Sequence, residues 1–236
     1  MNLRSSSPAP AVPHLAVAIL LLLAAAPADA FVLGIDWGTI GHNGWNDAYN
    51  ISWNNGASQA WVYAGSFNAY NDGTPGHPLP YNQGAYLGQV FCVDLLHDIY
   101  PPTEYDVVSY LTSDPNVPLH NAERAAWLYD NEIGKIGGDV QKAAGLQLAL
   151  WNAVYDSDYS LAGGSFQASG SQTAVNFAAA ALGDLSTAQV GSAVATFYRD
   201  TNGGQDMIGM VPEPATLLLL GFGLCALGLF WKGRDH

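Results

Sequence analysis

The chain is 236 residues long, 49% of it is hydrophobic, and 20 acidic against 7 basic residues give a formal net charge of -13 at pH 7. Such acidity disfavours binding to nucleic acid and to anionic lipid, so we predict no nucleic-acid partner. Once the two apolar ends are set aside, the length suits one domain with a sizeable core.

The first 30 residues have the pattern of a secretory signal peptide. Arg4 precedes an apolar stretch from Leu15 to Ala26, and Ala28-Asp29-Ala30 is a small-x-small cleavage pattern. We therefore expect signal peptidase to remove residues 1–30 after Sec-dependent export, with Phe31 as the first mature residue.

Residues 31–118 have the pattern of a β-rich region. Short β-prone runs, such as Ala60–Tyr63 and Gly88–Val93, alternate with turn signals such as Asn54-Asn55-Gly56. Four tryptophans recur at a constant interval of eight residues: Trp37, Trp45, Trp53 and Trp61. Both core packing on one sheet face and a platform for stacking sugars fit this spacing.

Residues 119–185 have the pattern of helices. Capping residues precede two apolar-periodic runs, and a glycine follows a third run that is rich in alanine. The predicted helices are residues 122–129 after Asn121, residues 140–155 after Asp139, and residues 173–182 before Gly183.

We predict an α+β fold for the exported domain, residues 31–211: a mostly antiparallel sheet covered by about three helices. Residues 186–211 would contribute a final strand and a linker. The predicted signal peptide and a C-terminal transmembrane helix flank this domain.

The C-terminal segment, residues 212–236, has three parts in order: Pro212, Glu213 and Pro214, an uncharged apolar run over residues 215–231, then Lys232 and Arg234. The run is a transmembrane-helix candidate, and the basic pair would stay on the cytoplasmic side. This tail resembles the PEP-CTERM sorting signal of exported proteins in Gram-negative bacteria. The resemblance implies an exosortase partner, inner-membrane anchoring through residues 215–231, and then a place on the cell surface or in the matrix. An ordinary C-terminal anchor is the alternative.

The exported domain contains a single cysteine, Cys92, because Cys225 lies in the apolar tail. Exported proteins usually use cysteines in pairs, so a buried thiol, an intermolecular disulfide and an internal bond to a group other than sulfur are all open. Gln147 lies in the apolar run Leu146–Trp151, where a buried carboxamide needs partners. It is either a hydrogen-bonded core residue or the acyl group of a thioester formed when the Cys92 thiol expels ammonia.

Phe91-Cys92-Val93-Asp94 resembles the aromatic-Cys-hydrophobic-polar motif of bacterial surface thioester domains. Gln147-Leu-Ala-Leu-Trp151 resembles their Gln-x-x-hydrophobic-Trp motif, although the family often has threonine where this chain has Leu146. The resemblance covers the region from Tyr86 to Arg199. It implies an internal thioester between Cys92 and Gln147, with Trp151 as its shield.

These residues predict covalent capture, in which an amine or hydroxyl of a target attacks the Gln147 carbonyl and frees the Cys92 thiol. Such a protein would act once, as an adhesin or matrix crosslinker of the cell envelope, and would not be an enzyme. The alternatives are a non-covalent polysaccharide-binding protein and a purely structural envelope or biofilm protein. The histidines are scattered without metal-ligand spacing, so we predict neither a metal nor a cofactor.

Overall fold

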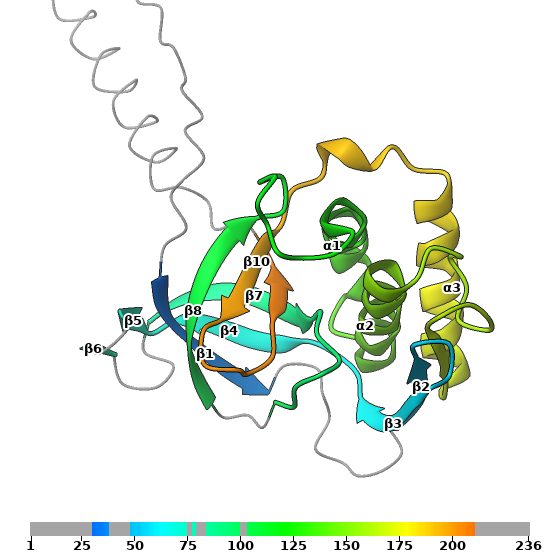
Figure 1. Ribbon diagram of the computed structural model, residues 1–236, viewed down its shortest axis with the longest axis horizontal. Helices are drawn as coiled ribbons and strands as arrows, with labels where there is room; N and C mark the ends of the chain where they lie inside the picture. The colour runs from blue at the N-terminus through cyan, green and yellow to red at the C-terminus, as the bar shows by residue number, and fades with distance from the viewer. Residues whose placement is uncertain (1–29, 38–47, 75–76, 79–83, 100–102, 211–236) are drawn as a thin grey trace, which may run out of the picture.

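The structure is a computed structural model that describes residues 30–37, 48–74, 77–78, 84–99 and 103–210 (Figure 1). Residues 1–29 of the predicted signal peptide, the Pro-Glu-Pro motif and the predicted membrane helix lie outside these ranges. Among the residues that are described, no helix combines the length and apolar character needed to cross a bilayer.

Six antiparallel strands close into a barrel in the order β1-β4-β7-β11-β10-β8, with β1 pairing to β4 on one edge and to β8 on the other. The strands are β1 (Ala30–Trp37), β4 (Phe67–Asn71), β7 (Ala85–Cys92), β8 (Thr103–Leu111), β10 (Thr196–Asp200) and β11 (Met207–Gly209). The β10–β11 hairpin comes after all three helices in the chain and fills the place between β7 and β8. The barrel is therefore complete only when this C-terminal hairpin is inserted.

The end of β7 lies between the barrel and the helices. Val90, Phe91 and Cys92 are consecutive and all buried, whereas a strand with one solvent face alternates buried and exposed residues. Helix α1 (Ala122–Ile136) covers one face: the Phe91 ring meets the Tyr129 ring edge-on at a centroid distance of 6.2 Å. The Tyr129 hydroxyl also donates to the Gln89 carbonyl oxygen at 2.7 Å.

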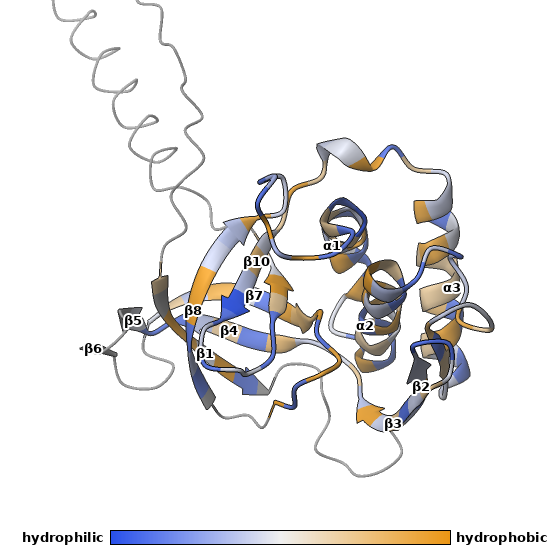
Figure 2. Ribbon diagram, in the orientation of Figure 1, coloured by the Kyte–Doolittle hydropathy of each residue, from blue (hydrophilic) through white to orange (hydrophobic). Residues whose placement is uncertain are grey.

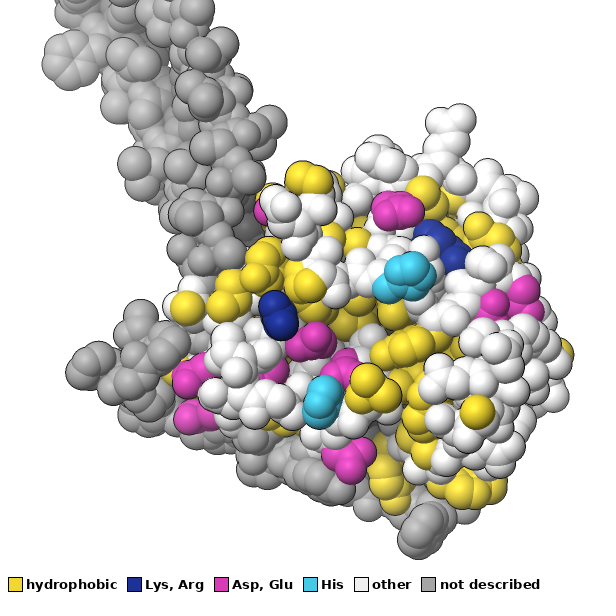
Figure 3. Space-filling model, viewed as in Figure 1, with side chains coloured by type: hydrophobic (Ala, Val, Ile, Leu, Met, Phe, Trp, Pro, Cys, Tyr) yellow, Lys and Arg dark blue, Asp and Glu magenta, His cyan; other side chains and the backbone are white. Residues whose placement is uncertain are grey.

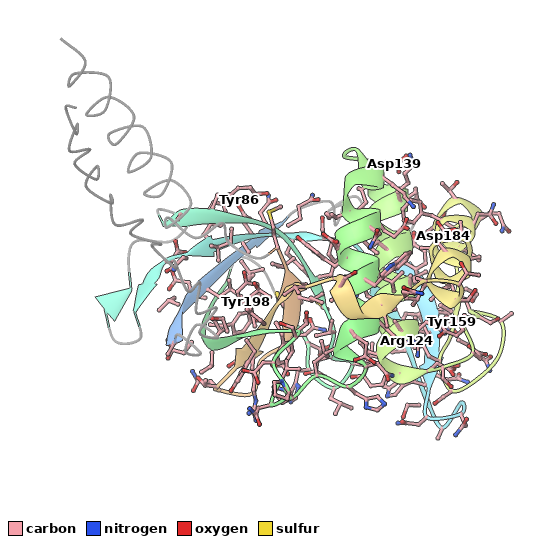
Figure 4. The ribbon with its side chains drawn as sticks, turned by 90° about the horizontal axis from the view of Figure 1, so that it is seen from above. Tyr86, Arg124, Asp139, Tyr159, Asp184 and Tyr198 are labelled. Carbon is pink, nitrogen blue, oxygen red and sulfur yellow. The ribbon has the colours of Figure 1, made fainter. Side chains whose placement is uncertain are left out.

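Three helices pack on one another beside the barrel: α1, α2 (Val140–Tyr155) and α3 (Gln172–Ser186) (Figures 1 and 4). Every residue of α2 from Ala143 to Val154 is buried, so this helix is enclosed on all sides. The Asp139 carboxylate caps α2 by accepting the backbone N–H groups of Gln141 and Lys142 at 2.8 and 3.2 Å. One continuous hydrophobic core links the helices to the barrel, and Figure 2 shows hydrophobic residues in both.

A smaller sheet of order β3-β2-β9 lies beside the helices (Figure 1). Its strands are β2 (Ala48–Trp53), β3 (Ser58–Tyr63) and β9 (Gln167–Ser169). The predicted turn joins β2 to β3: Asn54, Asn55 and Gly56 have φ angles of 54°, 57° and 83°, which these residue types tolerate. The other elements of the described residues are the short hairpin of β5 (Gly73–Thr74) and β6 (His77–Pro78) and the 3-10 turn η2 (Val190–Ser192).

The predicted fold class is wrong in its architecture. We expected an α+β fold with a mostly antiparallel sheet covered by about three helices, but the strands close into a barrel and the three helices pack beside it. The physical reason is the pairing of β1 with β8, in which Ala30 lies opposite Val108. Residue alternation defines a strand and its faces, but it does not say which distant strand each edge meets.

Candidate functional site

A cleft of about 420 Å³ is lined by residues from five segments of the chain. They are the β2–β3 hairpin, the start of β4, the end of β7 with the residues that follow it, the middle of α2, and the loop that joins β10 to β11. On the face shown in Figure 3, acidic and histidine side chains lie beside hydrophobic ones between the barrel and the helices. The cleft contains both the lone cysteine of the domain and the glutamine of α2.

Cys92 and Gln147, which are 55 positions apart in the chain, meet at the wall of this cleft. The Cys92 backbone N–H donates to Gln147 Oε1 at 2.9 Å, and Gln147 Nε2 donates to the Cys92 carbonyl oxygen at 2.7 Å. The carboxamide thus pairs with both polar groups of the Cys92 backbone, as a neighbouring strand would. The residues are only 3% and 1% exposed, so the pairing satisfies groups that are largely removed from water.

A second glutamine, Gln205, holds the Cys92 sulfur. The Cys92 thiol donates to Gln205 Oε1 at 2.9 Å, and Gln205 Nε2 donates to the Asp94 carbonyl oxygen at 2.7 Å. The second bond orients the Gln205 amide so that its oxygen faces the sulfur. Gln205 lies in the β10–β11 loop, and Met207 of β11 pairs with Cys92, so the C-terminal hairpin brings Gln205 to the thiol.

The surroundings of Cys92 favour its neutral form. Burial raises the pKa of the Cys92 thiol well above its usual value, and the nearby Asp94 carboxylate raises it further. A neutral thiol is a weak nucleophile, so any attack by this sulfur depends on groups that accept its proton or activate its target.

A histidine–carboxylate pair lines the same cleft. The His97 Nδ1–H donates to Asp94 Oδ2 at 2.5 Å. This hydrogen bond and the Asp94 charge raise the pKa of His97, while desolvation opposes them. The pair has the arrangement of a general acid–base, with one ring nitrogen fixed by a carboxylate and the other available for proton transfer.

Two tryptophans of the cleft carry buried N–H groups that have no partner in the part of the chain that the structure describes. Trp151 lies one turn after Gln147 on α2, and its ring centroid is 6.4 Å from that of Phe166. Its Nε1 has no hydrogen-bond partner among the described residues, and neither has Nε1 of Trp53 on β2.

The structure brings three predicted site residues into one cleft: Cys92, Gln147 and Trp151. Their chemical roles stay predictions. The predicted sorting residues lie outside the described part of the chain: Pro212, Glu213 and Pro214. Gln205 was not predicted, because it stands in a polar run, Asp200–Asp206, in which no spacing or motif distinguishes it from its neighbours.

The two tryptophans of the predicted series whose side chains are described differ in their exposure to solvent. Trp53 is half-buried, Trp61 is 68% exposed, and both line the cleft. The side chain of Trp37 and all of Trp45 lie outside the description. Within the described residues, no three His, Cys, Asp or Glu side chains gather as a metal site would require.

Comparison with known families finds a PEP-CTERM protein-sorting motif at residues 211–234. No curated protein and no solved structure matches the chain. The predicted sorting signal is thus confirmed, while the resemblance to thioester domains finds no support in these comparisons. The chain is an exported protein that carries a PEP-CTERM sorting motif, which marks it as an exosortase substrate.

Proposed function

We propose that this protein captures a target covalently through an internal thioester between Cys92 and Gln147. The observation that carries the proposal is the pairing of the Gln147 carboxamide with the Cys92 backbone inside an accessible cleft. Gln147 lies in the same cleft as a thiol, an indole ring that can act as a shield and a histidine–carboxylate pair.

Formation of the bond is an acyl transfer within the chain. The Cys92 sulfur bonds to the side-chain carbonyl carbon of Gln147, the carbon–nitrogen bond breaks, and the nitrogen leaves as ammonia with the thiol proton. The Cys92 N–H already donates to Gln147 Oε1, so it is placed to stabilise the negative charge that develops on this oxygen. Gln205 holds the sulfur inside the cleft and accepts the hydrogen bond of its proton.

In the capture step the Cys92 sulfur, which was the nucleophile in bond formation, becomes the leaving group. An amine of the target attacks the same carbonyl carbon, a new amide forms, the carbon–sulfur bond breaks, and Cys92 recovers a thiol. Because the thiol pKa is raised, the sulfur leaves readily only when it receives a proton. His97, held by Asp94, can take the proton of the amine and return it to the sulfur. The protein is consumed in this reaction, so it is not an enzyme.

The sorting signal determines where in the cell envelope this chemistry would take place. We propose that the Sec machinery exports the chain, that residues 215–231 hold it in the inner membrane, and that exosortase processing delivers it to the surface or matrix of a Gram-negative bacterium. A single-use acyl donor at that location would act as an adhesin or as a matrix crosslinker.

Intact-mass spectrometry tests the thioester. The purified protein should be one ammonia lighter than its processed sequence, and methylamine should restore the Cys92 thiol and add one methylamine at Gln147. The variants Cys92→Ala and Gln147→Ala should lose both the deficit and the adduct. Gln141→Ala, which removes a carboxamide from the same helix, should keep both. A full mass and a freely titrating thiol in amine-free wild-type protein would refute the thioester.

A further inference from the structure

The wall of the cleft formed by β3 presents aromatic rings to solvent. Trp61 and Tyr63 are 68% and 48% exposed, and both line the cleft. They are two residues apart on one strand, so their side chains stand on the same face of the sheet. Large exposed rings at a concave site are typical of ligand binding, and the flat C–H face of a pyranose sugar stacks on such rings.

The charges at the cleft select among sugars. Asp94 and Asp98 line it, whereas none of its described lining residues is lysine or arginine. Further carboxylates lie near the cleft, because the charges of Asp200 and Asp206, like that of Asp94, raise the pKa of His97. A cationic ligand is attracted to such a site and an acidic polysaccharide is repelled.

We infer that the captured target is an amino-sugar polymer with free primary amines, such as a de-N-acetylated hexosamine chain; this rests on the proposed thioester. The sugar ring stacks on Trp61 and Tyr63. Its ammonium is drawn to Asp94 and Asp98. After losing a proton, the amine attacks the Gln147 carbonyl carbon, a carbon–nitrogen bond forms, the carbon–sulfur bond breaks, and Cys92 leaves as a thiol.

The test compares probes on the purified protein by intact mass. A glucosamine tetramer should form an adduct about tenfold faster than methylamine at equal amine concentration, because about 1.4 kcal/mol of ring stacking corresponds to tenfold tighter binding. The N-acetylated tetramer and a cellulose tetramer should form none. Trp61→Ala should bring the glucosamine rate down to that of methylamine.

Tyr86 provides the matched control, since it is 57% exposed on β7 and lies on the barrel away from the helices (Figure 4). Tyr86→Ala should keep the fast glucosamine reaction. In Cys92→Ala protein, the glucosamine tetramer should still quench tryptophan fluorescence, and the quenching should be lost in Cys92→Ala/Trp61→Ala.

Two failures are distinguishable. The amino-sugar inference is overturned, and the thioester stands, if methylamine adds but the glucosamine tetramer reacts no faster. The same holds if a lysine peptide reacts as fast as the glucosamine tetramer, whether in wild-type protein or in Trp61→Ala. If wild-type protein shows no ammonia deficit and no methylamine adduct, the thioester itself is refuted, and covalent capture of an amino sugar falls with it.

Discussion

The pairing of Gln147 with the Cys92 backbone should contribute strongly to stability, independently of any thioester. The cleanest perturbation is Gln147→Met in a Cys92→Ala background, because methionine has nearly the volume of glutamine but cannot replace its hydrogen bonds, and alanine removes the thiol chemistry. The change leaves the N–H and the carbonyl of residue 92 without partners in a buried site. A buried group left unsatisfied costs about 1–3 kcal/mol, so the two together should cost about 2–6 kcal/mol.

Equilibrium unfolding in urea measures this loss. With a slope of about 2 kcal/mol per M, the midpoint of Cys92→Ala/Gln147→Met should fall about 1–3 M below that of Cys92→Ala. Gln59→Met, at an exposed position of β3, is the matched control and should change stability by less than about 0.5 kcal/mol. If the buried substitution were as mild as the exposed one, the carboxamide would not be holding the Cys92 backbone and the reasoning about the site would fail.

Three further predictions concern the acid–base pair, the helices and sorting. Asp94 raises the pKa of His97 above 6.5, so the pair stabilises the fold below the unfolded-state pKa and this contribution is lost as pH rises through the raised value. An NMR titration of the His97 ring should give a pKa above 6.5, and Asp94→Asn should return that pKa toward 6.5. Gly145→Ala should lower the melting temperature, because its Cβ would lie 2.6 Å from a backbone oxygen of α3, whereas Gly134→Ala on α1 meets nothing within 4 Å and should stabilise by up to about 1 kcal/mol. A Gly145→Ala protein that melted higher would contradict this packing. Replacing residues 212–214 by alanine should leave the unprocessed chain in the inner membrane, and wild-type maturation of that variant in fractionated cells would contradict exosortase sorting.

Local features of the chain were predictable where local forces decide them. Helix α2 has the predicted bounds, 140–155, and the predicted cap, because the Asp139 carboxylate satisfies backbone donors next to it in sequence. Asn121 also precedes a helix, but it adopts a left-handed conformation and its side chain donates to the Val154 carbonyl oxygen at 3.3 Å, so a tertiary contact replaces the cap. Helix α3 continues through Gly183, because Leu185 beyond it is buried.

Features set by distant contacts were not predictable. Strand β11 has only three residues, all buried, so it shows no alternation by which a strand is recognised. Barrel closure depends on which edges meet, and the role of Gln205 depends on the β10–β11 hairpin lying beside β7. The pairing of Cys92 with Gln147 was predicted from a resemblance, and the structure places the two side by side, but neither periodicity nor spacing would have joined them.

The position of β11 limits how the tail can be processed. This strand ends at Gly209, and the matched sorting motif begins at Val211, so only Met210 separates them. An extended chain spans about 3.3–3.6 Å per residue, which keeps Pro212 within about 11 Å of the barrel wall. The motif is therefore presented to the sorting enzyme without a long tether: exosortase engages it either close to a folded barrel or before the C-terminal hairpin is inserted. The order of these two events decides whether a molecule leaves the membrane with its cleft already assembled.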